Sequence, residues 1–296
     1  MSHGKFGVAI HGGAGVNPGQ DYQIVERDLN LLIHACRDRL AGGASALDVV
    51  EWVIGEMEGS GFYCAGRGSG PNTDGIYELD ASIMDGALRR AGGVCAVRDV
   101  VSPIAAARLV MEKTPHVLLA GAGANAFCER HGLAHVTDPG TYYVTPIGVL
   151  DSEIAPAGQT LRTHGTVGAV ALDLAGNLAA GTSTGGTFGK LPGRIGDTPI
   201  AGLGTWADKK VAISCTGIGE TFILSGGAGN VAARILYGQG TVQTASDAMI
   251  ADVGDLGGDG GVIAIDSDGQ VSFSFNSPGM KRACAGSDCP TMIAVF

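Results

Sequence analysis

Glycine is the residue that most constrains the fold of this chain, because it occupies 50 of the 296 positions. The glycines follow no G-X-Y period, so a collagen-like triple helix is excluded. They predict instead many tight turns and several places where the backbone closely approaches another group. Hydrophobic residues make up 45% of the sequence and charged residues 16%, as in an ordinary globular protein. The length suits one large domain or two smaller ones.

Charge and cysteine content exclude several classes of function. The formal net charge of −10 argues against nucleic-acid binding, because phosphate recognition needs a clustered basic surface. The seven cysteines lack the spacing of a metal site, and we expect them to be reduced and mostly buried. The N-terminus has no apolar stretch of a secretion signal, and no run of about 18 apolar residues could cross a membrane. We therefore expect a cytoplasmic protein without nucleic-acid or membrane partners.

Periodicity and turn residues predict helices and strands that alternate in blocks. Helices are predicted over residues 22–40, 45–53, 103–111, 125–129, 225–237 and 245–253. Strands are predicted over residues 6–10, 76–84, 167–172, 178–184, 210–215, 261–265 and 271–275. Residues 132–164 have little periodicity and predict an exposed linker. Blocks of this kind favour layers of sheet covered by helices.

Hairpin geometry places two threonines opposite each other. If residues 173–177 form the loop between strands 167–172 and 178–184, the numbers of facing residues sum to 350, and Thr166 faces Thr184. Facing residues of an antiparallel pair have Cβ atoms about 4.5–5.5 Å apart. Geometry alone leaves two interpretations open: a pair of hydroxyls with a catalytic role, or two threonines selected for their β-propensity.

Six segments, in order along nearly the whole chain, resemble the plant-type asparaginase/isoaspartyl peptidase family. They are HGGAG (11–15), ELDASIMDG (78–86), HGTVGAVALD (164–173), TSTGGTFGKLPGRIGD (182–197), SCTGIGE (214–220) and FNSPGM (275–280). Six ordered motifs are far more specific than any one of them. The resemblance implies an N-terminal-threonine hydrolase that acts on β-aspartyl dipeptides or on L-asparagine. We expect dipeptides to be the better substrates, because Arg67 can pair with the carboxylate of their leaving residue, which L-asparagine lacks.

The resemblance implies that Thr166 is the nucleophile of two reactions. A threonine hydroxyl needs a base, and an α-amine with a pKa of about 8 can take its proton near neutral pH. That amine is free only after the bond between Gly165 and Thr166 is cut, and family members cut it with the same hydroxyl. Glycine suits position 165 because it tolerates strained backbone.

The resemblance also assigns residues to the aspartyl head of the substrate. Thr184 hydrogen-bonds the Thr166 hydroxyl and tunes it. Arg194 and Asp197 hold the α-carboxylate and the α-amine, since a guanidinium fork suits a carboxylate and a carboxylate suits an ammonium. Without the resemblance, this pair of residues would be interpreted as a surface ion pair of little consequence.

Three more residues are carried over from the SCTGIGE segment. The hydroxyl of Thr216 and the backbone N–H of Gly217 match an oxyanion hole, which stabilises charge on the scissile carbonyl. The carbonyl of Gly219 matches a contact to the substrate amine. On the sequence alone, residues 216–217 would be an ordinary turn.

A sodium ion is the only bound group that the resemblance implies, and no cofactor is expected for catalysis. Its ligands are backbone carbonyls, which fall here on Met57, Glu58, Ser60, Tyr63, Ala65 and Arg67. The sequence departs from the family pattern at this loop, because Cys64 replaces an asparagine and Arg67 an apolar residue. Cys64 is also a rival nucleophile, although no histidine lies near it in the sequence.

Other interpretations compete with this one. Gly121 to Ala126 form a GxGxxA segment that could bind NAD, with Asp138 as a ribose partner. A single match of this kind arises easily by chance in a glycine-rich chain, and no βαβ frame is evident. A glycosylasparaginase is a close alternative, and the missing secretion signal counts against it. A precursor-like binding protein that never matures is the non-enzymatic alternative. His11 is expected to be a strand-end histidine satisfied by backbone more than a catalytic residue.

The resemblance implies an α+β fold, the four-layer αββα sandwich of the N-terminal nucleophile hydrolases. Cleavage would divide this single domain into residues 1–165, which include the linker, and residues 166–296, which begin with the nucleophile. Relatives form homodimers of the cleaved unit, and we expect the same here.

Purified protein should therefore yield two fragments with time, the smaller beginning at Thr166. Thr166→Ala should remain intact and inactive, while Thr166→Ser should mature slowly because only the hydroxyl is retained. Denaturing gels and mass spectrometry measure both outcomes. Efficient cleavage of the alanine variant would refute the assignment of the nucleophile.

Overall fold

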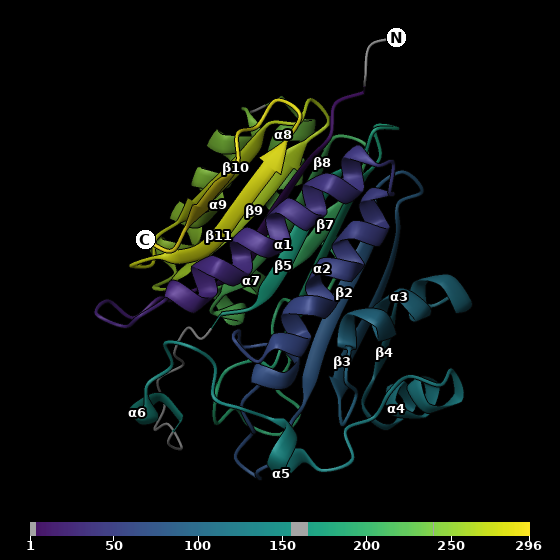
Figure 1. Cartoon of the computed structure of the whole chain (residues 1–296), viewed down its shortest axis with the longest axis vertical. Coiled ribbons are helices and arrows are strands. Elements are labelled where there is room, and N and C mark those ends of the chain that lie inside the picture. Colours follow the sequence, from purple (N-terminus) through teal and green to yellow (C-terminus); the bar gives the residue numbers. More distant parts are fainter. Residues whose placement is uncertain (1–3, 155–164, 239) are drawn as a thin grey trace.

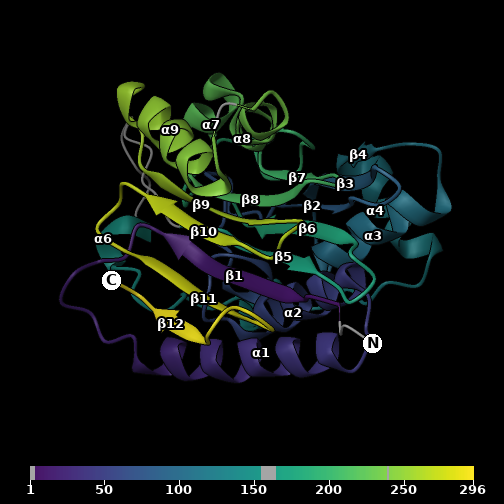
Figure 2. The same cartoon turned by 90° about the horizontal axis from the view of Figure 1, so that it is seen from above.

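Two β-sheets lie face to face in the computed structural model, which describes residues 4–154, 165–238 and 240–296 (Figures 1 and 2). The larger sheet has the order β12 (Met292–Ala294), β11 (Met280–Gly286), β1 (Gly7–Ala14), β5 (Val167–Leu172), β6 (Leu178–Thr184), β2 (Leu79–Asp85), β3 (Arg90–Val97) and β4 (Leu118–Ala120). The smaller sheet has the order β10 (Val271–Phe275), β9 (Gly260–Asp266), β8 (Val211–Gly217) and β7 (Thr205–Ala207). All pairs of neighbouring strands are antiparallel except β3 and β4.

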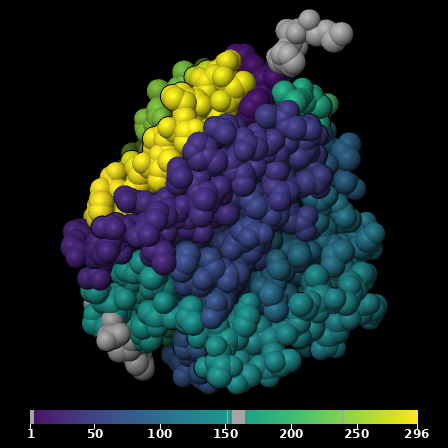
Figure 3. Space-filling model, in the orientation of Figure 1, coloured from purple at the N-terminus to yellow at the C-terminus, as the bar shows by residue number. Residues whose placement is uncertain are grey.

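Helices cover the outer faces of both sheets (Figure 2). The larger sheet carries α1 (Gln23–Ala41), α2 (Ala46–Ser60) and α3 (Pro103–Lys113). The smaller sheet carries α8 (Gly227–Leu236) and α9 (Val242–Asp255), next to α7 (Gly219–Ser225). The space-filling view shows α1 and α2 covering much of one face beside the C-terminal strands (Figure 3). The shorter helices are η1 (Gly66–Gly68), α4 (Gly121–Arg130), α5 (Pro139–Tyr142) and α6 (Asp151–Ile154).

Apolar periodicity explains why the helices lie on the sheets. One face of α1 is buried through Val25, Leu29, Ile33, Cys36 and Leu40, which recur at helical spacing. The Ser45 side chain caps the N-terminus of α2, since it accepts a hydrogen bond from the N–H of Asp48. Each fully buried leucine or isoleucine contributes about 1.5–3 kcal/mol relative to an exposed one.

Small apolar side chains fill the space between the two sheets. Ala9, Val170 and Ala180 on the larger sheet are fully buried and belong to one cluster with Ala212 and Ile263 on the smaller sheet. Among the described residues, no helix is both long and apolar enough to cross a bilayer. Six of the seven cysteines are buried and Cys289 is partly exposed, and none forms a disulfide, as the sequence predicted.

The hairpin between β5 and β6 has the predicted register. Val167 pairs with Ser183 and Gly168 with Thr182, so the numbers of facing residues do sum to 350. Two more predicted strands, residues 261–265 and 271–275, also form a hairpin, in which Val271 pairs with Ile265. The sequence therefore predicted the strands at both places and the register at the first.

Other strands were not predicted from the sequence. Strands β3, β7, β11 and β12 were not predicted, because they are short or lack alternation. In β3, Gly92 has no side chain to show the pattern, and a Cβ there would lie 2.1 Å from the carbonyl oxygen of Ala107 in α3. The predicted linker is not wholly irregular, since it contains α5 and α6, and its residues 155–164, including His164, lie outside the described residues.

Candidate active site

Thr166 and Thr184 meet at the open end of the β5–β6 hairpin. Thr166 immediately precedes β5, Thr184 is the last residue of β6, and their hydroxyl oxygens are 3.3 Å apart. The exposed fractions of these residues are only 5% and 4%. Thr184 Oγ1 also accepts a hydrogen bond from the N–H of Gly186, which fixes its position. The Thr166 hydroxyl is thus buried, oriented and paired with a second hydroxyl, as hairpin geometry predicted.

A small cavity surrounds the two threonines and contains most of the predicted site. Its free volume is about 10 Å³, roughly the room that one water molecule needs. The residues that line it are Gly165, Thr166, Thr184, Gly186, Thr187, Arg194, Gly196, Asp197, Thr198, Gly217 and Gly219. Thr216 lies next to it, with its hydroxyl accepting a hydrogen bond from the N–H of Ala14 at 3.2 Å. Segments far apart in the sequence therefore converge on the bond between Gly165 and Thr166.

Strand β1 packs its glycines directly against this bond. Gly165 has φ +83° and Gly13 has φ +102°, both in the left-handed region that favours glycine. A Cβ on Gly13 would lie 2.6 Å from the Cα of Gly165 and 3.1 Å from the backbone nitrogen of Thr166. The space that glycine leaves at position 13 is therefore occupied by the peptide bond that the sequence predicts to be cut.

His11 holds the carbonyl of the nucleophile's own residue. Its Nδ1 donates to the Thr166 carbonyl at 3.0 Å, and its Nε2 accepts from the Ser214 hydroxyl at 2.9 Å. These directions follow from the partners, because a carbonyl can only accept. Burial lowers the pKa of His11 to about 3, although the bond to Thr166 opposes this shift, so the ring is neutral. The expectation that backbone satisfies His11 is confirmed.

The guanidinium of Arg194 binds a residue that the sequence analysis did not single out. Its Nε and Nη2 donate to the two carboxylate oxygens of Glu220 at 2.8 and 2.7 Å, a bidentate fork. Arg194 and Asp197 both line the cavity, but no hydrogen bond joins their side chains in the described part of the chain. The signal for Glu220 was its place at the end of SCTGIGE, where only the preceding residues were assigned.

Asp197 is a buried carboxyl group without a full set of partners. Its residue is 4% exposed, and its Oδ2 has no hydrogen-bond partner among the described residues. Burial raises its pKa to about 7, although hydrogen bonding within its own residue and the nearby positive charge of Arg194 act in the opposite direction. A buried acceptor of this kind, open to a small cavity, suits a cationic ligand group.

The six carbonyls assigned to sodium lie in one segment at the end of α2 and in the following loop. The residues are Met57, Glu58, Ser60, Tyr63, Ala65 and Arg67. Two glycines leave room beside these carbonyls: a Cβ on Gly66 would lie 2.5 Å from the Glu58 oxygen, and one on Gly68 2.0 Å from the Tyr63 oxygen. In the described part of the chain, no group of three His, Cys, Asp or Glu side chains could hold a metal ion. The carbonyls of Tyr63, Ala65 and Arg67 accept hydrogen bonds from backbone N–H groups of this region and of residue 144. Backbone oxygens are ligands of the kind that suits a hard cation.

The two unusual residues of this loop do not contact the nucleophile. Cys64 is buried, and burial raises the pKa of its thiol to about 11, which disfavours the thiolate that a nucleophile needs. Arg67 does not line the Thr166 cavity. It lines a separate cavity of about 530 Å³ together with His135 and Asp138, and its Nε donates to the carbonyl of Tyr142.

The GxGxxA segment does not form a dinucleotide site. It opens α4 directly after β4, and a parallel β3–α3–β4 unit precedes it, which the sequence did not reveal. However, β4 is the edge of its sheet, so no described strand follows α4 in parallel. A Cβ on Gly121 or Gly123 would meet nothing within 4 Å, and Ala126 is exposed, whereas a dinucleotide turn needs close packing at these positions.

The fold and the threonine site define a hydrolase class, and comparison with known proteins identifies it. The chain belongs to the asparaginase family, whose sequence model matches residues 4–294. It is 41% identical to an isoaspartyl peptidase of Salmonella typhimurium, with 97% of each chain covered. It is 38% identical to a probable isoaspartyl peptidase/L-asparaginase of Arabidopsis thaliana, with 99% of each covered, and 40% identical to a plant-type L-asparaginase of Pyrobaculum calidifontis, with 93% and 95% covered.

Gly13→Ala should slow self-cleavage strongly, by about 10-fold or more, because the new Cβ displaces the peptide bond beside Thr166. Gly19→Ala is the matched control: its φ of +88° imposes the same backbone strain, but a Cβ there meets nothing within 4 Å. The rates are measured by densitometry of denaturing gels. Equal slowing in both variants would mean that backbone strain at a left-handed position, and not contact with Gly165, is responsible.

Proposed function

We propose that this chain is a self-processing isoaspartyl peptidase that releases L-aspartate from β-aspartyl dipeptides and, less efficiently, from L-asparagine. The observation that carries the proposal is the Thr166–Thr184 hydroxyl pair, which follows Gly165 in a cavity shared with Arg194 and Asp197. The names of the similar proteins, isoaspartyl peptidase and L-asparaginase, support the class of substrate.

In the first reaction the chain cuts itself. The Thr166 hydroxyl oxygen attacks the carbonyl carbon of Gly165, its proton passes to the Thr166 nitrogen, and the peptide bond becomes an ester. Water then hydrolyses the ester, which leaves residues 1–165 and residues 166–296. His11 donates a hydrogen bond to the Thr166 carbonyl, and Thr184 accepts one from the Thr166 hydroxyl. The nucleophile is therefore oriented before the attack.

In the second reaction the same hydroxyl attacks the substrate. The new α-amine of Thr166 takes the hydroxyl proton and gives it to the leaving amine, and an aspartyl ester of Thr166 forms. The Thr216 hydroxyl and the N–H of Gly217 stabilise the oxyanion. Water, activated by the same amine, then releases aspartate. No step needs a cofactor.

The aspartyl head is recognised by charge. The Nε and Nη2 of Arg194 donate to Glu220, which fixes the plane of the guanidinium. Its Nη1 is the donor that would bind the α-carboxylate of the substrate. Asp197 supplies the buried acceptor for the α-ammonium, and the Gly219 carbonyl a second one. A Cβ on Gly219 would lie 3.0 Å from Asp197 Oδ1, so glycine keeps these two acceptors close together.

We assign the fold to the four-layer αββα sandwich of the N-terminal nucleophile hydrolases. Two facing sheets with α1–α3 on one outer face and α7–α9 on the other support this assignment (Figure 2). The structure has three hydrophobic cores. One lies between each sheet and its helices, and the third lies between the two sheets.

A sodium ion and a second copy of the cleaved unit complete the proposal. Sodium would be held by the carbonyls of the loop after α2 and would fix the shape of that loop, without a part in bond cleavage. Dimer formation agrees with large exposed apolar side chains on α7 and at the end of α8. Leu224, Leu236 and Tyr237, which directly follows α8, have exposed fractions of 74%, 57% and 75%.

Arg194→Ala should still cut itself, because the precursor has no free substrate carboxylate to hold. Its kcat/KM for β-aspartyl-leucine should fall by about 2–4 kcal/mol of transition-state binding. Aspartate release from β-aspartyl-leucine and from L-asparagine is measured side by side, and the dipeptide should be the better substrate of the wild type. Equal hydrolysis of dipeptides with free and blocked α-carboxylates would contradict this role of Arg194.

The preference for a free α-amine should depend on pH. Below about pH 7 the Asp197 carboxyl is neutral, so it loses its attraction for an ammonium as the pH falls through this value. The ratio of kcat/KM for β-aspartyl-leucine to that for succinyl-leucine, which lacks the amine, should therefore decrease from pH 8 to pH 6. The amine of Thr166 serves both substrates and cancels from the ratio. A ratio that does not change with pH would rule out Asp197 as the partner of the amine.

A further inference from the structure

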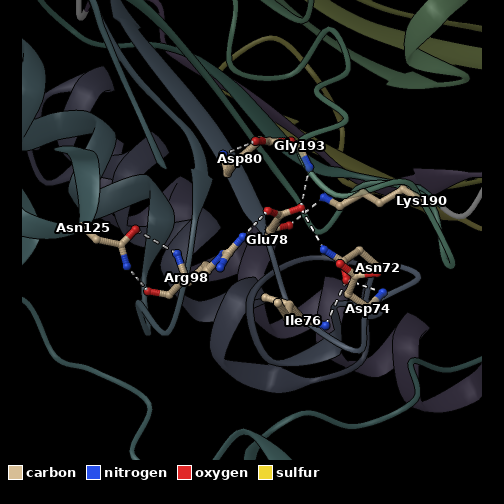
Figure 4. Close-up of polar contacts among 10 residues, drawn as sticks. Asn72, Asp74, Ile76, Glu78, Asp80, Arg98, Asn125, Lys190 and Gly193 are labelled. Atoms are coloured by element: carbon tan, nitrogen blue, oxygen red, sulfur yellow. Dashed lines mark hydrogen bonds and ion pairs between the residues drawn. The ribbon is translucent and has the colours of Figure 1, made fainter. Parts of the chain in front are cut away.

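A buried carboxylate outside the cavity supports the loop that carries Arg194 and Asp197. Glu78 immediately precedes β2, and its side chain is 3% exposed. Figure 4 shows it between Arg98 on one side and Lys190 and Gly193 on the other. Neither the proposed reaction nor the assigned substrate contacts uses any of these four residues.

The carboxylate of Glu78 accepts three hydrogen bonds. Oε1 accepts from Arg98 Nη2 at 2.8 Å, and Oε2 accepts from Asn72 Nδ2 at 3.0 Å and from the backbone N–H of Gly193 at 2.9 Å. Burial alone would raise its pKa, but these bonds and the charge of Lys190 outweigh it and hold the pKa below its usual value. Glu78 is therefore an ionised, acceptor-only group in the interior.

The same residue also binds the loop through its backbone. The ammonium of Lys190, in a residue that is 3% exposed, donates to the carbonyl oxygen of Glu78 at 2.7 Å. The carbonyl of Lys190 in turn accepts from the N–H of Thr73, next to Asn72. Two points of the loop, Lys190 and Gly193, are thus fixed to one residue of the larger sheet. The next residue after Gly193 is Arg194.

We propose that Glu78 is the positioning residue of the aspartyl-binding loop. It fixes the turn at residues 190–193, and this turn sets the place from which the Arg194 guanidinium reaches the cavity. The inference rests on the proposed role of Arg194 in holding the substrate α-carboxylate. Glu78 acts through that residue and does not touch the substrate.

A carboxylate is needed here because all its partners are donors. An amide of the same shape has one acceptor oxygen, and its NH2 group would face the hydrogens of Arg98, or those of Asn72 and Gly193. Glu78→Gln therefore loses at least one of the bonds and leaves the cations Arg98 and Lys190 with less compensation. The turn that carries Arg194 is then held less firmly, and a displacement of a substrate-holding group weakens binding steeply.

The test compares three variants with the wild type, using β-aspartyl-leucine as the substrate. Glu78→Gln should raise KM about 10-fold with kcat changed less than about threefold, because the nucleophile is untouched. Self-cleavage should proceed at the normal rate, since it needs no aspartyl head. Arg98→Gln is the matched control: it also removes a bond to Glu78, but from the half-exposed side away from the loop, and should lower Tm without raising KM. Arg194→Ala reports on the proposed role of that residue by itself.

Each outcome decides the question. A raised KM in both Arg194→Ala and Glu78→Gln, with Arg98→Gln normal, supports the inference. A raised KM in Arg194→Ala alone overturns it but leaves the proposed function intact, whereas a normal KM in Arg194→Ala removes its basis. If Arg98→Gln raises KM as much as Glu78→Gln, general destabilisation is responsible and the inference fails. Should Glu78→Gln not fold, Lys190→Met, which removes the bond to the Glu78 carbonyl together with the positive charge beside Glu78 and Asp80, must raise KM for the inference to stand.

Discussion

The antiparallel pairing of β5 with β6 builds the site at which we propose that the chemistry takes place. Val167 faces Ser183, and this register brings the hydroxyls of Thr166 and Thr184 within 3.3 Å of each other. A slip of one residue would turn every side chain of one strand to the opposite face of the sheet. The hairpin is held from both sides by β1 and β2, and the buried carboxylate of Glu58 accepts a hydrogen bond from Ser183. The proposed nucleophile thus adjoins a hairpin that is held by a neighbouring strand on each side.

Electrostatics around the nucleophile are arranged for a zwitterionic ligand. Burying a charge costs free energy unless the charge is paired. Among the described residues near the cavity, some charged groups are paired within the protein and one lacks a full set of partners. Arg194 is paired with Glu220, and Glu78 is paired with Arg98 and bonded to the loop. Asp197 lacks a full set of partners, and its pKa is raised to about 7 by burial. A ligand ammonium would complete this site, which explains how a small cavity can select one end of a substrate.

The bond between Gly165 and Thr166, where we propose self-cleavage, is closely packed against the backbone of β1. Gly13 and Gly165 face each other with no side chain between them, and His11 anchors the carbonyl of Thr166 from the same strand. The neutral imidazole is a donor to this carbonyl at any physiological pH, because its pKa is lowered to about 3. The segment HGGAG therefore packs against the proposed cleavage site, and Gly13 allows this contact because it has no side chain.

Features that depend on neighbouring residues were predictable from the sequence: the helical periodicity of α1, the register of the β5–β6 hairpin and, through the six ordered motifs, the family. The contacts between groups far apart in the sequence were not. Glu220 and not Asp197 pairs with Arg194, Gly193 is bound by Glu78 115 positions away, and His11 is bound to Thr166 155 positions away. The position of β4 at the edge of its sheet likewise excludes the GxGxxA segment as a dinucleotide site. Periods, caps and turns depend on local backbone geometry, whereas these contacts arise only after strands distant in the sequence pair and bury their polar groups together.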